Sequence, residues 1–481
     1  MSTQSQPMEL TEPSVNTRSD SDDPRAQQVP ALPEVPVSRR KQASILISAF
    51  TTIALTIGYN QTFGVFQEYY LSPSQDVLVP SPASEASPPT ALLAFVGTLC
   101  YGLTWAGGML VSPVISRIEA GFWVSTPRRR MLRYLTNRTI TVSGVFLMSA
   151  GFALASLSTS IWQLLLTQGF LVGIGMSFLY FPLLAPAPEY FTNHRATAMG
   201  FMLAGGGAGG LALSPLIRSL LTSVGGRWTL RIYALINLVG GLPVAWAVPR
   251  SRFTAPTSTT PSPAEGAAPE RRNTHVSRVL AVRATFIFSA IAAFLQAAGA
   301  QLPLAFIPSY TVILGLGASK GANLLAASNA INAVSRVLTG YAGDRLGRQN
   351  TLVLTLLLAA VSVFAFWLTS VTTGNVDLWM AFIVLYSFAG GGYYALFPAL
   401  IAEVFGIRQY AAVNAFILFV RGLGTMFGSP VGGQLLGGSD RGTKAYLGIA
   451  FWDGALLMGA TVCCVGVRWA DAKGKGWKWI A

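Results

Sequence analysis

Long apolar stretches, separated by short polar segments, run along the chain from about residue 43 to near its end. A helix needs about 20 mostly apolar residues to cross the hydrocarbon core of a bilayer. By that measure we expect twelve helices, at roughly 43–66, 92–115, 139–157, 161–184, 197–221, 229–248, 283–314, 321–342, 350–371, 377–400, 411–436 and 446–468. The pattern predicts an all-α integral membrane protein.

Polar segments at both ends and in the middle divide these helices into two sets of six. Residues 1–38 are rich in Ser, Pro, Asp and Gln, and residues 249–280 in Pro, Ser, Thr and Ala. Such compositions are typical of disordered tails and flexible linkers. We therefore expect a disordered tail at 1–38, a six-helix bundle at 39–248, a linker at 249–280, a second bundle at 281–470 and a tail at 471–481.

The two sets share short motifs at matching places. A Ser-Pro pair begins at Ser214 and again at Ser429, and a Phe-Pro pair begins at Phe181 and again at Phe397. Both pairs recur at an offset of about 215 residues, in corresponding helices of the two sets. Parallel repeats of this kind build some secondary transporters, with the substrate site between the repeats. The repeat predicts two six-helix pseudo-repeats.

Charge and composition agree with a membrane protein. Only 11% of the residues are charged and 52% are hydrophobic, whereas soluble domains average about 25% charged residues. The formal net charge is +14, and the basic residues gather in short segments between apolar stretches. That distribution is typical of cytoplasmic loops and gives no support to nucleic-acid binding. We expect a multi-pass protein of the plasma membrane, in contact with lipid, with both termini cytoplasmic.

Side chains that would support enzyme or metal chemistry are not grouped. The three cysteines lie in apolar stretches without CxxC spacing, and His194 and His275 are far apart. The glycine-rich run at 205–210 lies inside an apolar stretch, where small residues let membrane helices pack closely. We expect no catalytic residue, no metal and no cofactor. A membrane-bound enzyme, identified by product formation, and a non-transporting nutrient receptor, identified by binding without flux, are the alternative classes.

Arg336 and Arg421 are the basic residues placed well inside apolar stretches. A charge at mid-bilayer depth costs at least about 2.5–3.5 kcal/mol, so it normally faces a bundle interior or a water-filled cavity. A guanidinium can hold a carboxylate through two parallel hydrogen bonds. We expect Arg336 to bind an anionic group of the substrate and Arg421 to assist or gate. The alternative is that each bonds a backbone carbonyl or an acidic side chain within the bundle.

Neutral polar residues accompany these arginines. Asn332 lies one helical turn before Arg336 and therefore on the same face. Tyr59, Asn60 and Gln61, near the end of the first stretch, can supply further hydrogen bonds. We predict that all four belong to the substrate site, with bonding between helices as the equal alternative.

A charged turn, GDRLGR, joins the stretches at 321–342 and 350–371. A carboxylate near a helix N-terminus and arginines across a hairpin can break and re-form contacts as helices move. We expect this turn to act as a gate, with a plain solvated loop as the alternative. Its residues are Gly343, Asp344, Arg345, Gly347 and Arg348.

This turn is similar to the loop motif of the major facilitator superfamily, which the chain resembles over about residues 43–470. GYNQTFGVFQEYY from Gly58, YFP from Tyr180 and the single Arg336 resemble the monocarboxylate porters, particularly fungal ones. The lactate carriers of that family have a lysine near the end of the first helix and an aspartate four residues before the arginine. This chain has Asn60 or Gln61 and Asn332 at those places.

The resemblance implies a secondary transporter that works by alternating access. Its substrate would be an organic anion, either a monocarboxylate or a carboxylate-bearing secondary metabolite. The alternative is an efflux pump for a larger, not necessarily acidic, secondary metabolite. Proton coupling and facilitated diffusion both stay open, because Glu189, Glu403 and Asp453 lie nearer the ends of their stretches than the middle.

Overall fold

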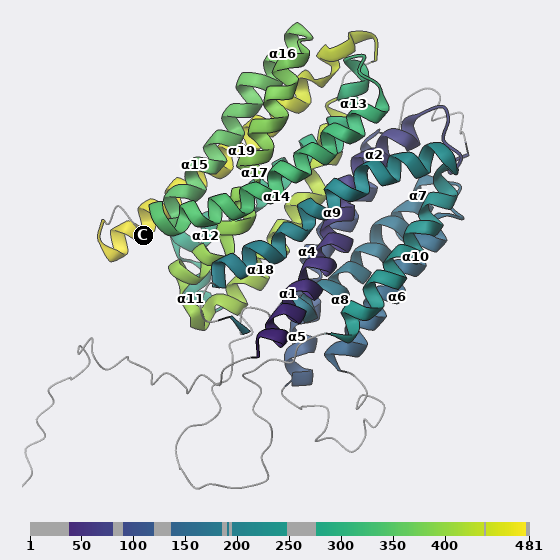
Figure 1. Ribbon diagram of the computed structural model, residues 1–481. Helices are drawn as coiled ribbons and strands as arrows, with labels where there is room; N and C mark the ends of the chain where they lie inside the picture. The colour runs from purple at the N-terminus through teal and green to yellow at the C-terminus, as the bar shows by residue number, and fades with distance from the viewer. Residues whose placement is uncertain are drawn as a thin grey trace, which may run out of the picture. The chain divides into compact units, whose positions relative to one another are not determined.

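Helices run through every stretch that the apolar pattern indicated (Figure 1). This computed structural model describes residues 38–79, 90–119, 136–184, 190–191, 195–247, 276–436 and 439–477. Most of the predicted N-terminal tail and of the predicted linker lies outside these residues. No strand occurs in the described ranges, in agreement with the predicted all-α class.

Several of the membrane-length segments are built from consecutive helices that continue through a short π-helical turn. The first set contains α1 (Arg39–Ile53), η1 (Ala54–Gly58), α2 (Tyr59–Leu71), α4 (Thr90–Ala106), α5 (Gly108–Glu119), α6 (Asn137–Ala155), α7 (Ile161–Leu164), η3 (Leu165–Leu171), α8 (Val172–Leu184), α9 (Arg195–Ser223) and α10 (Gly225–Trp246). The second set contains α11 (Arg278–Ala281), α12 (Ala284–Ala300), α13 (Leu302–Ile313), α14 (Ala318–Leu346), α15 (Arg348–Ser362), η5 (Val363–Trp367), α16 (Leu368–Thr373), α17 (Val376–Phe405), α18 (Ile407–Gln434), η6 (Ser439–Tyr446) and α19 (Leu447–Lys475).

Among the described residues, ten helical segments are long and apolar enough to cross a membrane. The other two predicted stretches are also helical but differ in composition or continuity. The stretch at 92–115 is divided between α4 and α5 at Gly107. Helix α14 is rich in Asn, Ser and Gly and carries Arg336 and Asp344, which lowers its apolar character. Its polar residues are accommodated because much of the helix packs against other helices.

Contacts between the two sets run along α9 with α14 and along α4 with α18. The glycine run of α9 makes the first contact close: a Cβ at Gly207 would lie 2.7 Å from the Ala333 Cβ. On another side of α9, a Cβ at Gly209 would lie 2.8 Å from the Ala54 Cα of η1. Only glycine permits both approaches, which is the packing role expected of small residues in membrane helices.

Each set is filled by a cluster of aromatic rings. In the first, Tyr59 packs against Phe152 and Tyr233 with ring centroids 4.8 and 4.9 Å apart. In the second, Trp379 packs against Tyr310 and Phe382, at 4.6 and 5.2 Å. Such pairs add about 0.5–1.5 kcal/mol each beyond the area that they bury.

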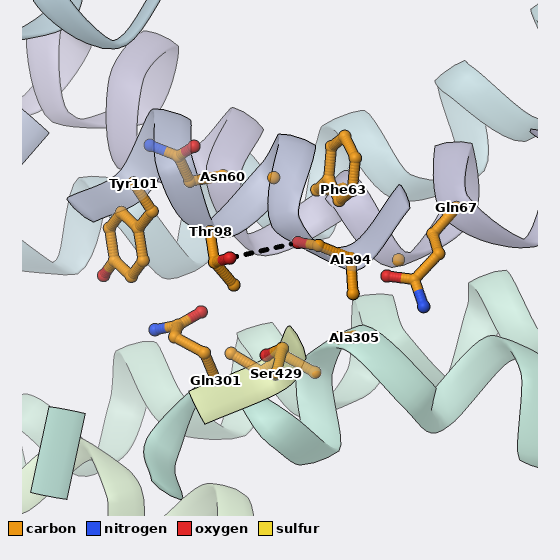
Figure 2. Close-up of a pocket in the computed structure, with 12 residues that line it drawn as sticks. Asn60, Phe63, Gln67, Ala94, Thr98, Tyr101, Gln301, Ala305 and Ser429 are labelled. Atoms are coloured by element: carbon orange, nitrogen blue, oxygen red, sulfur yellow. Dashed lines mark hydrogen bonds between the residues drawn. The ribbon is translucent and has the colours of Figure 1, made fainter. Parts of the chain in front are cut away.

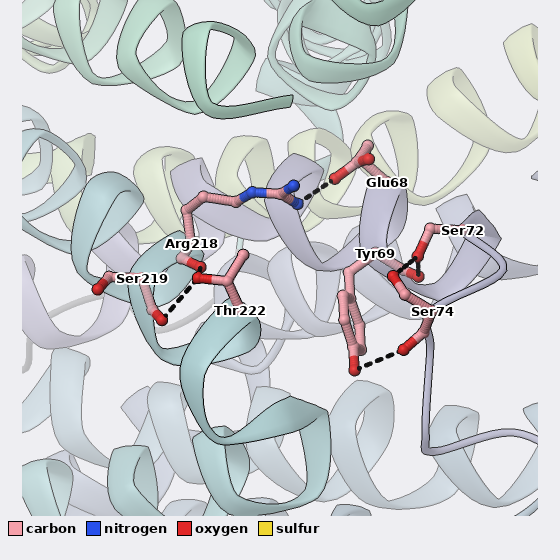
Figure 3. A network of polar contacts seen from close by, with 7 residues as sticks. All are labelled: Glu68, Tyr69, Ser72, Ser74, Arg218, Ser219 and Thr222. Atoms are coloured by element: carbon pink, nitrogen blue, oxygen red, sulfur yellow. Dashed lines mark hydrogen bonds and ion pairs between the residues drawn. The ribbon is translucent and has the colours of Figure 1, made fainter. Parts of the chain in front are cut away.

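An ion pair joins α2 to α9 (Figure 3). The Arg218 Nη1 lies 2.8 Å from the Glu68 Oε2, and the two side chains are only 20% and 14% exposed. Beside it, the Tyr69 hydroxyl donates a hydrogen bond to Asp76 at 2.9 Å. These contacts bind the end of α2 to the segment that follows it and to α9.

Candidate functional site

The ring of Tyr394 on α17 contacts the guanidinium groups of two buried arginines. The Cζ of Arg336 on α14 lies 4.6 Å from the ring centroid, and that of Arg421 on α18 lies 4.5 Å from it. The two arginines are 1% and 4% exposed. A cation within about 6 Å of an aromatic face is attracted by the negative face of the ring. Tyr394 therefore stabilises two like charges that would otherwise repel each other.

Each nitrogen of the Arg336 guanidinium donates a hydrogen bond. Its Nε donates to the Asn332 Oδ1 at 2.9 Å, and its Nη1 donates to the backbone carbonyl of Leu203 on α9. Its Nη2 donates to the Gln61 side-chain oxygen at 3.1 Å, in the amide orientation that gives both ends of Gln61 a partner. Arg336 thus joins α14 of the second set to α2 and α9 of the first.

Asn332 and Gln61 extend this network. The Asn332 amide donates to the Ser387 carbonyl on α17 at 3.3 Å. The Gln61 amide donates to the Gly206 carbonyl at 2.9 Å and to the Asn329 Oδ1 at 3.2 Å. Bonding between helices, the alternative that the sequence left open, therefore describes these residues and Arg336 in this conformation. Their role toward a substrate stays a prediction.

Arg421 has a different environment, because its side chain makes no hydrogen bond to any described residue. Its Cζ lies 4.8 Å from the ring centroid of Tyr393 and 5.4 Å from that of Trp105. Three buried donors in this cluster have no partner among the described residues: the Arg421 Nε, the Trp105 Nε1 and the Tyr393 hydroxyl. A buried donor without an acceptor costs about 1–3 kcal/mol. This donor cluster would therefore be stabilised by a ligand that supplies acceptors.

Two small cavities are lined by residues from both helix sets, and the lining of the second includes Gln61, Asn332 and Tyr394, which contact Arg336. The first, with an empty volume of about 320 Å³, has Asn60, Gln67 and Thr98 on one side and Gln301 and Ser429 on the other (Figure 2). The second, of about 310 Å³, is lined in part by Gln61, Asn332, Tyr386 and Tyr394.

A contact between hydroxyl groups links the linings of the two cavities, since the hydroxyls of Tyr101 and Tyr394 lie 3.3 Å apart. Tyr101 lines the first cavity and Tyr394 the second. The Gln301 amide also donates to the Tyr394 hydroxyl, at 3.3 Å. Tyr394 thus contacts both arginines and lines the second cavity.

Asn60 and Tyr59 lie apart from Arg336. Asn60 lines the first cavity, and its amide donates to the Met176 Sδ at 3.2 Å. Tyr59 is fully buried in the aromatic cluster of the first set, where its hydroxyl accepts a hydrogen bond from Gln168 at 2.7 Å. The structure therefore brings Gln61, Asn332 and Arg336 together, but not Tyr59.

Trp105, Tyr393 and Tyr394 were missed by the sequence reasoning. Aromatic residues in an apolar stretch are usually packing or lipid-facing residues, so nothing in their type singles them out. The available signal was local: two tyrosines directly follow Gly390–Gly392 in the middle of an apolar stretch. Three glycines without side chains leave room there for a polar helix face.

The predicted gate forms contacts at the junction of α14 and α15. Asp344 pairs with Arg348 at 3.2 Å, and Arg348 lies 3.9 Å from Glu403 on α17. Arg345 lies over the Tyr341 ring at 5.3 Å from the centroid. Gly347, with φ of 92°, makes the turn between the helices, since other residues rarely adopt positive φ.

Gly343 faces Leu396 of α17. All of these contacts join helices of the second set, so the gating role of the turn stays a prediction.

A polar site with two buried arginines, enclosed by membrane-length helices from two sets, defines a multi-pass membrane transport protein. The chain belongs to the Major Facilitator Superfamily. The sequence profile of this family matches residues 120–429 and, in a second overlapping match, residues 325–475. The predicted all-α membrane fold is thereby confirmed, and so is the prediction that the protein is not an enzyme.

Known proteins resemble the chain along most of its length. The MFS-type transporter pynF of Aspergillus niger is 27% identical over 427 residues, covering 88% of this chain and 87% of pynF. The agnestins efflux protein AgnL12 of Paecilomyces divaricatus is 26% identical over 416 residues, covering 86% of this chain and 84% of AgnL12. The partially occluded, inward-open xylose transporter XylE from E. coli has the same fold, with a TM-score of 0.62, 16% identity and coverage of 88% and 97%.

Proposed function

We propose that this protein exports a secondary metabolite that carries hydrogen-bond acceptors, in the simplest case a carboxylate or another oxygen anion. The observation that carries the proposal is the pair of buried guanidinium groups on one tyrosine ring, Tyr394, where the two helix sets meet. The similarity to AgnL12, an agnestins efflux protein, supports export of a larger metabolite over uptake of a small monocarboxylate.

Arg421 is the better candidate for the anion ligand, because its side chain makes no hydrogen bond to a described residue. With Trp105 and Tyr393 it offers three unmet donors next to aromatic faces. A planar, oxygen-rich aromatic compound would satisfy the donors and stack on the rings.

Arg336 would couple the site to the movement of the helices. Its bonds to Leu203 and Gln61 cross from the second set to the first, so they must break if the two sets separate there. Asn332 and Gln61 would then be free to bind substrate. Asn60 would contribute from the neighbouring cavity, while Tyr59 would hold that part of the first set in position.

The turn of Gly343, Asp344, Arg345, Gly347 and Arg348 would gate one end of the path, as its ion pairs re-form between conformations. The plasma membrane, with both termini cytoplasmic, is the proposed location. It fits the clustering of basic residues in short segments and an export function.

Transport by the full-length protein in liposomes tests the proposal. The probe is a labelled naphthalene dicarboxylate, a planar dianion that crosses lipid slowly, and the measurement is its exchange against unlabelled probe. We expect saturable exchange whose apparent affinity falls about 10- to 150-fold in Arg421→Met and is unchanged in Arg231→Met, a substitution at an arginine outside the site. Equal exchange in liposomes without protein, or in both variants, would contradict the assignment. Binding without exchange would favour a receptor.

A further inference from the structure

Asp453, the seventh residue of α19, has a fully buried carboxyl group. Neither carboxyl oxygen has a hydrogen-bond or ion-pair partner among the described residues. Two other carboxylates that are largely withdrawn from solvent have partners: Asp471 on the same helix accepts a hydrogen bond from Gln349 at 3.0 Å, and Glu68 pairs with Arg218 at 2.8 Å. Asp453 differs from them in having nothing to offset a negative charge.

An ionised carboxylate without a partner is costly in such a place. The penalty for burying an ion amounts to several kcal/mol even after the protein relaxes, and it is recovered only by an opposite charge or by hydrogen bonds. The neutral acid carries only the smaller cost of a buried polar group. The geometry of this conformation therefore suits the protonated form of Asp453.

The elements packed against α19 differ in the ionisable groups that they carry. Helix α12, η5 and α16 contain none. Those on the other packed elements are Arg348 on α15, Arg408, Tyr410 and Arg421 on α18, and Asp440, Arg441, Lys444 and Tyr446 on η6. The phenol of Tyr386 on α17 interacts electrostatically with Asp453.

Three successive residues at the end of α12 connect Asp453 to the candidate site. A Cβ at Gly299 would lie 3.1 Å from the Asp453 Oδ1, so the backbone of α12 passes close to the carboxyl group. The next residue, Ala300, accepts a hydrogen bond from the Tyr386 hydroxyl at 3.3 Å, and both residues line the second cavity. Gln301 then donates to the Tyr394 hydroxyl.

This connection lies at a break in the helix. Helix α12 ends at Ala300 and α13 begins at Leu302, with Pro303 in its first turn. Proline removes a backbone donor and is a common cause of a bend in a helix. A change of angle at this break would move Gly299 relative to Asp453 and, at the same time, Ala300 and Gln301 relative to the cavity.

We propose that Asp453 is the proton-binding group through which a proton gradient drives this transporter. In the conformation described, the carboxyl group holds a proton. When the break between α12 and α13 moves and opens the carboxyl group to water, the proton leaves, and the same movement rearranges the wall that Ala300, Tyr386 and Gln301 form beside Tyr394. The coupling role, in which a proton enters as the substrate leaves, rests on the proposed export function. Proton binding by Asp453 does not depend on that function.

Infrared difference spectroscopy of the full-length protein in lipid tests proton binding without any substrate, because protonated and ionised carboxyl groups absorb at separate frequencies. We expect a protonated-acid band at neutral pH that Asp453→Asn removes and Asp453→Glu keeps or shifts. Asp471→Asn, the same change at a partnered carboxylate of α19, should leave the band in place. A wild-type protein without such a band, or its persistence in Asp453→Asn, would overturn the proton site.

Exchange and gradient-driven flux of the labelled naphthalene dicarboxylate in liposomes test coupling. We expect folded Asp453→Asn to keep exchange, while its flux under a proton gradient falls to the rate without one. Retained acceleration by the gradient, or loss of exchange as well, would overturn the coupling role. If the wild type does not carry the probe, the proposed substrate class fails, and the infrared result still decides the proton site.

Discussion

Replacing Arg421 by methionine should change the affinity for substrate much more than the stability of the folded protein. In the folded protein, the Arg421 side chain has no hydrogen bond to a described residue and contacts three rings. At about 0.5–2 kcal/mol each, these contacts contribute roughly 1.5–6 kcal/mol. The burial of an unpaired guanidinium costs several kcal/mol in the opposite direction. Methionine fills a similar volume and makes favourable sulfur–aromatic contacts, so we expect the stability of Arg421→Met to be within about 1–2 kcal/mol of wild type.

Binding should respond very differently. A hydrogen bond to a charged group is worth about 1.5–3 kcal/mol, and about 1.4 kcal/mol corresponds to a tenfold change in affinity. Loss of one such bond to the substrate predicts binding about 10- to 150-fold weaker. Thermal unfolding in detergent measures the stability, and equilibrium binding of the labelled naphthalene dicarboxylate measures the affinity. A variant that unfolds at a much lower temperature yet binds the probe as tightly as wild type would refute this reasoning.

Three further variants test contacts described above. Arg336→Met should unfold at a lower temperature than Arg421→Met, because it loses three hydrogen bonds of a charged group, at about 1.5–3 kcal/mol each; equal unfolding temperatures would argue against this. Glu68→Gln should destabilise the protein by about 1–3 kcal/mol, and adding Arg218→Met should cost little more in a double-mutant cycle; fully additive effects would mean that the ion pair is not energetically coupled. Gly209→Val should prevent folding, as judged by monodisperse protein in detergent, whereas Gly200→Ala should fold normally, because a Cβ at Gly200 meets nothing within 4 Å.

The helices were predictable because the bilayer imposes length and hydrophobicity on each of them. Even α14, which is less hydrophobic than the ten apolar segments, was predicted as a helix from the apolar residues between its polar ones. Arg336 and Arg421 could be singled out because a charge in an apolar stretch needs a special environment. The sequence could not predict that Arg336 donates hydrogen bonds from every guanidinium nitrogen while the Arg421 side chain makes none to a described residue. This difference depends on which carbonyl groups and aromatic rings of other helices lie near each arginine.

Asp453 shows the same limit more clearly. In the sequence it lies near the beginning of an apolar stretch, a place where an acidic residue usually reaches water or an interfacial group. In the structure, α12 covers it closely because Gly299 has no side chain. The burial of Asp453 thus depends on a glycine about 150 residues away in the sequence. Nothing in the sequence around either residue indicates that the two are in contact. Trp105 and Tyr393 were missed for a related reason. The sequence does not show whether the N–H or O–H group of an aromatic residue has a hydrogen-bond acceptor in the folded protein.

The glycine run of α9 has a consequence for the kinetics of transport. Where α9 meets α14, it presents backbone at Gly206 and Gly207 in place of side chains. Two helices in such contact can shift along each other without any rotamer changing, whereas interlocked side chains would have to repack. One turn away, the hydrogen bond from Arg336 to the Leu203 carbonyl does have to break. Resistance to the conformational change is therefore concentrated in a few polar bonds, and the temperature dependence of turnover should reflect the rupture of hydrogen bonds more than the repacking of a core.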